Sequence, residues 1–296
     1  MSNKEVNNKF HYNQNELFLT CVDHTVSRET FKLLYDNKYD LLLTYPKPED
    51  KELSKYYESE DYISHTDANT SLFDKVYQGV KNHTIKQKVK LINSFNYQNK
   101  TILDIGCGTG DFLEACSKNQ WNVTGIEPNK KARKISVHKT KQSIYTDIEE
   151  MINVTTKRYD IITMWHVLEH VPNLSEYIGL LKKLLSPKGT LIIAVPNYKS
   201  YDANYYGNFW AAFDVPRHLW HFSQKSIELI FGEFDFKIVK TLPMKFDAYY
   251  VSLLSEKYKS GFSNPIKAFY RGLLSNLKAK QNKEYSSLIY VIKNRY

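Results

Sequence analysis

Residues 101–110, with the sequence TILDIGCGTG, constrain the fold of this chain more than any other feature. The first five have the apolar, β-branched character of a buried strand, and Gly106, Gly108 and Gly110 allow a tight turn into a helix. Strand and helix patterns then alternate at short intervals as far as residue 195. This alternation predicts an α/β fold, in which a mostly parallel sheet carries helices on both faces.

The expected strands of this sheet cover residues 101–105, 121–126, 143–146, 159–164, 190–195, 236–242 and 286–293. Between them we expect one helix over residues 129–138 and another that begins after an N-cap at Asn173 and ends near residue 185. Ser223 is expected to cap a third helix. The pattern predicts a Rossmann-like sheet.

Three stretches lie outside the alternation. Residues 1–95 are expected to form an N-terminal extension and lid, and residues 96–296 the main domain. Within the main domain, residues 198–223 are an aromatic-rich insertion on the substrate side. Residues 246–284 are a basic helical insertion before the last strand.

Charge and composition restrict the class of protein. The formal net charge is +9, and residues 237–296 account for all of it, with twelve basic and three acidic residues. An apolar fraction of 42% excludes a disordered chain, and no window approaches the ~18 apolar residues of a membrane span. The polar N-terminus does not resemble a signal peptide, and three cysteines without a CxxC pair argue against a disulfide framework. We therefore expect a cytoplasmic protein.

The spacing of the glycines restricts the ligand. A dinucleotide-binding fingerprint needs GxGxxG, whereas here the third glycine comes one residue early and Asp111 occupies the last position. A carboxylate at the mouth of the loop would repel a pyrophosphate and would suit a ligand with a positive charge. This disfavours a nicotinamide-dependent oxidoreductase.

At this point the chain resembles the class I S-adenosylmethionine-dependent methyltransferases, of the small-molecule type that includes ubiquinone-biosynthesis-like enzymes. The resemblance covers about residues 101–197 and rests on four motifs at successive strand ends. It implies a seven-stranded sheet and S-adenosylmethionine as the cofactor, with S-adenosylhomocysteine as its product. The residues that it implies for cofactor binding are Asp104, Gly106, Gly108, Gly110, Glu127, Asp147, Ile148, His166 and, in a tyrosine-rich lid, Tyr62.

The function that the resemblance implies is methyl transfer to a small-molecule acceptor, with oxygen favoured over nitrogen or carbon. An RNA methyltransferase is the first alternative, but no RNA- or DNA-binding motif is present and the core is neutral, so no nucleic acid is expected. A non-catalytic protein that retains the cofactor pocket is another alternative. The sequence does not indicate an oligomeric state.

The segment His166-x-x-Glu169-His170 also suggests a metal, because some ubiquinone-biosynthesis O-methyltransferases hold a divalent cation with a similar acidic and histidine cluster after a strand. This chain differs from them in having His166 where they have an acid. Val171 and Pro172 follow directly and make a long zinc-protease helix improbable. We therefore expect no metal and a structural role for Glu169 and His170.

The aromatic insertion is the expected acceptor site, since ligands of such sheets bind beyond the carboxyl ends of the strands. His218 and His166 are the candidate general bases for removing the acceptor's proton. The candidate substrate-binding residues are Trp210, Phe213, Arg217 and His221. Arg217 has a second interpretation, a local ion pair with Asp214.

The basic insertion contains apolar residues at helical spacing, from Ile266 through Phe269 and Tyr270 to Leu277. Seven basic residues and no acidic ones lie between Lys257 and Lys283. One interpretation is an amphipathic helix that packs on the domain and exposes its basic face. The other is a peripheral surface that attracts anionic lipids or an anionic substrate.

Overall fold

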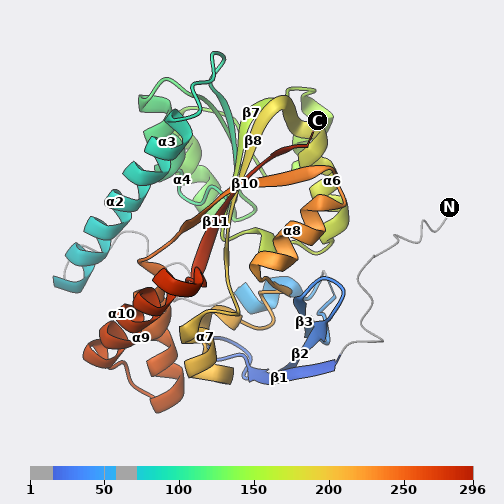
Figure 1. Ribbon diagram of the computed structural model, residues 1–296. Helices are drawn as coiled ribbons and strands as arrows, with labels where there is room; N and C mark the ends of the chain where they lie inside the picture. The colour runs from blue at the N-terminus through green and yellow to red at the C-terminus, as the bar shows by residue number, and fades with distance from the viewer. Residues whose placement is uncertain (1–15, 50, 58–71, 296) are drawn as a thin grey trace.

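The computed structural model describes residues 16–49, 51–57 and 72–295 (Figure 1). Its larger sheet has seven strands in the order β10-β11-β8-β7-β4-β5-β6. β11 runs antiparallel to both of its neighbours, and the pairs from β8 to β6 are parallel. The predicted seven-stranded, mostly parallel sheet is confirmed. Its strands are β4 (Thr101–Ile105), β5 (Asn122–Ile126), β6 (Ile144–Tyr145), β7 (Tyr159–Trp165), β8 (Leu185–Pro196), β10 (Phe236–Pro243) and β11 (Ser287–Asn294).

Helices cover both faces of this sheet because its central strands are apolar on both sides. Ile102 and Ile161 pack under α2 (Leu72–Asn93) and α3 (Asp111–Lys118). Their neighbours Leu103 and Ile162 point the other way, toward α6 (Leu174–Leu184) and α8 (Gln224–Gly232). Figure 1 shows α2 and α3 on one side of the sheet and α6 and α8 on the other. The remaining helices beside β5 and β6 are α4 (Lys130–Thr140) and α5 (Ile148–Val154).

Two helix starts are capped as the sequence predicts. The Asn173 side chain accepts a hydrogen bond from the backbone N–H of Glu176, and Ser223 forms a capping box with Ser226. α2 was expected to belong to the extension, but its buried residues Val89 and Ile92 pack in the same cluster as the large sheet. In the structure, α2 therefore covers the sheet.

A second, smaller sheet lies beyond the carboxyl ends of the parallel strands (Figure 1). It consists of β1 (Glu16–Val22), β2 (Thr30–Asp36), β3 (Leu41–Tyr45) and β9 (Trp220–His221), in that order. β9 belongs to the aromatic insertion, so residues 198–223 complete a sheet that the N-terminal extension begins. The same insertion contains α7 (Tyr201–Tyr206) and the short 3-10 helices η4 (Gly207–Phe209) and η5 (Ala211–Phe213).

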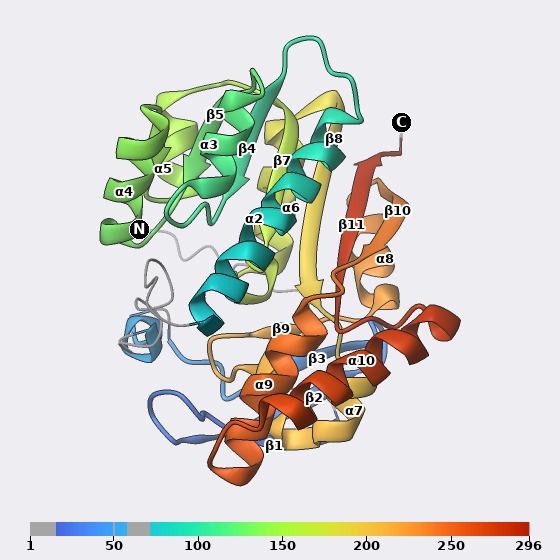
Figure 2. The ribbon, with the colours of Figure 1, turned by 90° about the vertical axis from the view of Figure 1, so that its left-hand side faces the viewer.

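The basic insertion forms a helical hairpin, α9 (Asp247–Ser260) and α10 (Pro265–Asn282). Figure 2 shows the two helices side by side beneath the large sheet. α10 does not bury its apolar stripe as one interpretation of the sequence expected, because Ile266 is 84% and Phe269 61% exposed. The residues that pack are small, among them Ala268, Gly272 and Ala279.

Within the part of the chain that the structure describes, no helix combines the length and the apolar character needed to cross a bilayer. The three cysteines, Cys21, Cys107 and Cys116, are all buried and unpaired.

Candidate active site

The glycine loop between β4 and α3 has a backbone that few other residues could adopt. Gly106, Gly108 and Gly110 all have positive φ, at 72°, 55° and 83°. A Cβ atom on Gly106 would lie 2.4 Å from Cγ2 of Val167, so this position is closed to a side chain. A Cβ on Gly108 would meet no atom within 4 Å. The loop therefore packs tightly at Gly106 and leaves space above Gly108.

Asp111 follows the loop, and its charge is already matched. Its two carboxylate oxygens lie 2.7 Å from Nζ of Lys81 and 2.6 Å from Nζ of Lys139. Burial opposes ionisation, but the two ammonium groups outweigh it and lower the pKa of Asp111. From the sequence, this carboxylate was expected to suit a ligand with a positive charge, but in the structure it forms ion pairs with Lys81 of α2 and Lys139 of α4.

Glu127 lies at the end of β5 and faces the loop. One of its oxygens accepts a hydrogen bond from the N–H of Gly108, and the other accepts from the N–H of Asn129, both at 2.8 Å. Only 9% of the residue is exposed. A carboxylate oxygen can accept more than one hydrogen bond, so each oxygen can also receive a ligand hydroxyl. The two backbone bonds fix the carboxylate beside the open space above Gly108.

Asp147 and Ile148 follow β6, the next strand along the edge of the sheet. The Asp147 side chain caps α5 by accepting from the N–H of Glu150 at 2.7 Å. Ile148 is buried in the core beneath. Both residues therefore lie at the strand end where the sequence places them, and Asp147 has a structural role there as well.

Asp104 is a buried carboxyl at the end of β4. The Thr163 hydroxyl donates to it at 2.6 Å. Burial raises the pKa of Asp104 to about 7, against the opposite effects of that hydrogen bond and of the Lys88 charge. Asp104 is thus buried in the sheet directly before the loop, where it hydrogen-bonds to the neighbouring strand β7.

Lys88 is a residue that sequence reasoning missed. It projects from α2, and its Nζ lies 4.1 Å from the centre of the Trp165 ring. Burial lowers the pKa of Lys88 to about 8, although Asp104 and Asp247 act in the opposite direction. Its position in a polar helix far from the motifs gave no signal in the sequence. A positive charge therefore stands between the glycine loop and the end of β7.

His166 occupies the first position after β7 and has a left-handed backbone, with φ of 57°. Its Nε2 lies 3.0 Å from Oδ2 of Asp247, and its Nδ1 lies 3.4 Å from Oε1 of Glu169. Burial opposes protonation, but these two carboxylates outweigh it and raise the pKa of His166 to about 10. His166 is therefore an imidazolium at neutral pH, which does not favour the general-base role predicted for it.

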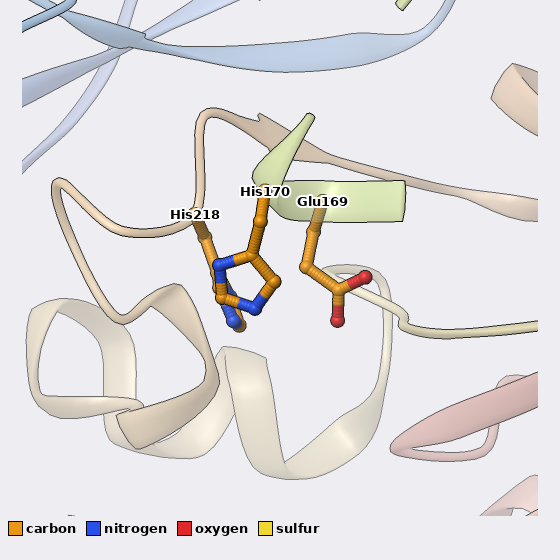
Figure 3. A group of neighbouring side chains, drawn as sticks. All are labelled: Glu169, His170 and His218. Carbon is orange, nitrogen blue, oxygen red and sulfur yellow. The ribbon is translucent and has the colours of Figure 1, made fainter. Parts of the chain in front are cut away.

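Glu169, His170 and His218 form a cluster in which one donor atom of each lies within 4.8 Å of the others. In Figure 3, Glu169 and His170 leave one short helix, η3 (Leu168–His170), and His218 comes from the neighbouring loop. Two imidazoles and a carboxylate are ligands that zinc and other transition metals accept. Neither oxygen of the buried Glu169 has a hydrogen-bond partner among the described residues. These three residues could hold a divalent cation.

The cluster also has a metal-free explanation. The protonated His166 faces Glu169 and matches its charge. Burial, followed by the nearby His218, lowers the pKa of His170 to about 4, so His170 is neutral. Its Nδ1 lies 3.0 Å from the carbonyl oxygen of Arg217 and 3.0 Å from the Tyr57 hydroxyl. His170 therefore serves to join η3 to the aromatic insertion.

The predicted substrate residues divide into groups. Trp210 and Phe213 are buried in the core between the small sheet and α7, where Nε1 of Trp210 donates to Asp202. His221 is also buried, beside the Thr44 hydroxyl at 3.0 Å, and burial lowers its pKa well below the usual value. His221 belongs to the second sheet, and Trp210 and Phe213 pack in the core beside it. The environment of all three side chains does not favour the acceptor contacts predicted for them.

Arg217 is held by its neighbours. Its guanidinium donates to Asp214 at 2.6 Å and to Asp23 at 3.0 Å, and only 4% of the residue is exposed. Of the two interpretations of Arg217, the geometry matches the local ion pair. Tyr62, predicted as a lid residue, lies outside the described residues.

A cavity of about 1040 Å³ lies beyond the carboxyl ends of the strands, between the aromatic insertion and the helical hairpin. His166, His218, Asp214 and Asp247 line its polar part. α9 contributes large apolar residues to its lining, which are Tyr250, Val251, Leu253, Leu254 and Tyr258, and the aromatic insertion contributes Ala211 and Ala212. His218 and His166 are thus brought to one cavity, and its large apolar lining residues come from α9 instead of from Trp210 and Phe213 of the aromatic insertion.

Known proteins match this chain in both sequence and fold. A family model described as a methyltransferase domain matches residues 77–241, more than half of the chain. The ubiquinone biosynthesis O-methyltransferase of Hydrogenovibrio crunogenus is 34% identical over 123 residues, which cover 38% of this chain and 51% of that protein. The corresponding enzyme of Actinobacillus pleuropneumoniae is 38% identical over 108 residues, covering 33% and 46%. The chain thus spans about half the length of these curated relatives.

Solved structures share the fold at low sequence identity. Magnesium protoporphyrin IX methyltransferase from Synechocystis, with bound S-adenosylhomocysteine, has a TM-score of 0.55 and 16% identity, covering 83% of this chain and all of that one. A methyltransferase from Archaeoglobus fulgidus has a TM-score of 0.50 and 20% identity, covering 72% and 94%. The family predicted from the motifs is confirmed. The chain belongs to the methyltransferase-domain family, within the class I S-adenosylmethionine-dependent methyltransferases.

Proposed function

We propose that this enzyme transfers a methyl group from S-adenosylmethionine to an oxygen atom of a partly apolar small molecule. The observation that carries the proposal is the cavity of about 1040 Å³, because it is lined by His166, the first residue after β7, and by His218. Volumes of this order are typical of small-molecule sites. The curated relatives are named O-methyltransferases, which favours oxygen as the acceptor atom.

The residues around the glycine loop fit the cofactor. Gly108 leaves open the space that a Cβ would fill, and the Glu127 carboxylate is held beside it by the N–H groups of Gly108 and Asn129. We assign Glu127 to the two ribose hydroxyls, and Asp147 and Ile148 to the adenine. The cofactor supplies a methyl group that its sulfonium has already activated for transfer.

Lys88 and His166 would hold the other end of the cofactor. The Lys88 ammonium over the Trp165 ring suits the carboxylate of the methionine part, since it stands beside the loop. His166, fixed between Asp247 and Glu169, is an imidazolium that can donate but cannot accept a proton. We therefore assign His166 to positioning at the junction of the two sites.

His218 is the proposed general base. Its Nδ1 lies 2.9 Å from the carbonyl oxygen of Ala212, which can only accept, so Nδ1 carries the proton and Nε2 has the free lone pair. Nε2 of His218 would take the acceptor's proton as the acceptor oxygen bonds to the methyl group, while the bond from that methyl group to sulfur breaks and S-adenosylhomocysteine leaves. Asp214, whose Oδ2 lies 4.0 Å from Nε2, then stabilises the imidazolium. General-base catalysis of this kind contributes roughly 10²–10⁴-fold.

The test is formation of S-adenosylhomocysteine from S-adenosylmethionine with a panel of phenolic acceptors. We expect turnover with at least one apolar phenol, and a loss of about 10²–10⁴-fold in kcat for His218→Gln with little change in cofactor affinity. His138→Gln, a change at an exposed residue in the last turn of α4, is the matched control. Full turnover in His218→Gln would remove the base from the proposal.

A further inference from the structure

The helical hairpin exposes a stripe of large apolar side chains. On α10, Ile266 is 84%, Phe269 61% and Tyr270 54% exposed, with Leu273 and Leu277 continuing the same side of the helix. Phe262, in the turn that joins α9 to α10, is 63% exposed. Six large apolar residues on one outward surface form a patch of the kind that marks an interaction site.

The packing of α10 on α9 explains why the stripe points outward. α10 contacts α9 through small residues, and Gly272 is so close that a Cβ there would lie 2.9 Å from Cα of Tyr249. Ala268, Ser275 and Ala279 are buried on the same side. Since the helix packs by its small side, its large apolar residues face away from the protein.

Basic residues lie along one flank of the stripe and near its end. The exposed Lys278 and the half-buried Lys267 and Arg271 follow one flank at helical spacing, and the exposed Lys280 lies near the end of the stripe. Lys267 is paired with Glu256, and Arg271 stacks on Tyr205. The segment 257–283 contains no acidic residue. A second copy of the chain would bring like charges together on this surface, so its chemistry favours an anionic partner.

The surface adjoins the acceptor cavity. Gly261, Ser263 and Pro265 line the cavity, and they alternate with the exposed Phe262 and Ile266 in the α9–α10 turn. The turn thus belongs to the rim of the cavity and to the apolar stripe at once. Figure 2 shows α9 and α10 at the outer end of the molecule, away from the strands that carry the glycine loop.

We propose that the α10 surface, formed by Phe262, Ile266, Phe269, Tyr270, Leu273 and Leu277 with its flanking lysines, docks on an anionic membrane. Apolar side chains on one side of a helix, with basic residues beside them, are the features by which interfacial helices enter the headgroup region. Each basic residue near an anionic bilayer adds to the attraction. Docked in this way, the enzyme holds the rim of its cavity at the bilayer, where a partly apolar acceptor can enter.

The test is sedimentation of the full chain with vesicles. We expect binding to phosphatidylcholine vesicles that contain phosphatidylglycerol, and much weaker binding to phosphatidylcholine alone. Ile266→Ser with Phe269→Ser should weaken the partition coefficient by about tenfold or more, and so should Lys278→Glu with Lys280→Glu. Val154→Ser, an exposed apolar residue at the end of α5, is the control and should bind like the wild type.

Circular dichroism and S-adenosylhomocysteine binding establish that each variant is folded. Equal binding to neutral and anionic vesicles, or none to either, would overturn the proposal. So would a dimer in light scattering that the Ile266→Ser, Phe269→Ser variant abolishes, because the stripe would then join two copies. Glu127→Ala separates this proposal from the proposed function. This variant should lose binding of S-adenosylhomocysteine and should bind anionic vesicles like the wild type.

Discussion

Gly106→Ala tests whether the glycine loop is built as the structure shows. Gly106 has a φ of 72°, and an L-residue in the left-handed region costs about 1–2 kcal/mol. The new Cβ would also lie 2.4 Å from Cγ2 of Val167, a β-branched side chain that cannot easily rotate away. Overpacking of this kind costs about 1–3 kcal/mol. We therefore expect a loss of about 2–5 kcal/mol in the free energy of unfolding.

Val167→Ala separates the two contributions. In that background the clash is gone and the backbone strain remains, so Gly106→Ala should cost about 1–3 kcal/mol less than it does in the wild type. Urea unfolding followed by tryptophan fluorescence measures the four stabilities of this cycle. The reasoning is refuted if Gly106→Ala costs less than about 0.5 kcal/mol, or if its cost is equal in both backgrounds.

Three further predictions concern the residues around His166. Because the folded-state pKa of His166 is raised to about 10, the stability that its protonation contributes is complete below about pH 6.5 and is lost as the pH rises through 10. Asp247→Asn should reduce the loss of stability at alkaline pH, which thermal unfolding at a series of pH values measures. An unchanged dependence of stability on pH would exclude the ion pair with Asp247 as the cause of that loss. Lys88→Met should weaken binding of S-adenosylhomocysteine and spare binding of adenosine, in calorimetry of both ligands; equal losses would contradict contact with the carboxylate. Since His166 already matches the charge of Glu169, turnover should survive dialysis against EDTA. Activity that vanished and returned with Mn²⁺ or Zn²⁺ would assign a metal to the cluster of Glu169, His170 and His218.

The parallel sheet and the glycine loop could be predicted because local sequence determines them. Residues 101–105 are a strand in the prediction and in the structure. The caps at Asn173 and Ser223 begin helices where the sequence predicts them. Such features depend on neighbours a few positions apart, so spacing alone identifies them. Glu127 could be placed for the same reason, since it ends a strand next to the loop.

The surroundings of the cavity depend on contacts between distant segments. The roles of Trp210 and His221 could not be read from their aromatic neighbours, because His221 completes a sheet with β3 and Trp210 packs in the core beside that sheet. Asp247 and Lys88 meet His166 and Trp165 only after folding, and neither carries a motif. The periodicity of α10 left two interpretations open, because it reports an apolar side without telling whether protein covers it. Close packing through Gly272 decides that question.

Calorimetric titration with S-adenosylhomocysteine tests the central claim most directly. The wild type should bind one equivalent, and Glu127→Ala should weaken binding by about tenfold or more, because it removes a charged acceptor of two hydroxyl hydrogen bonds. Glu149→Ala, an exposed carboxylate on α5, is the matched control and should bind like the wild type. Absence of binding to the wild type, or equal affinity in Glu127→Ala, would contradict the assignment of this site to the cofactor.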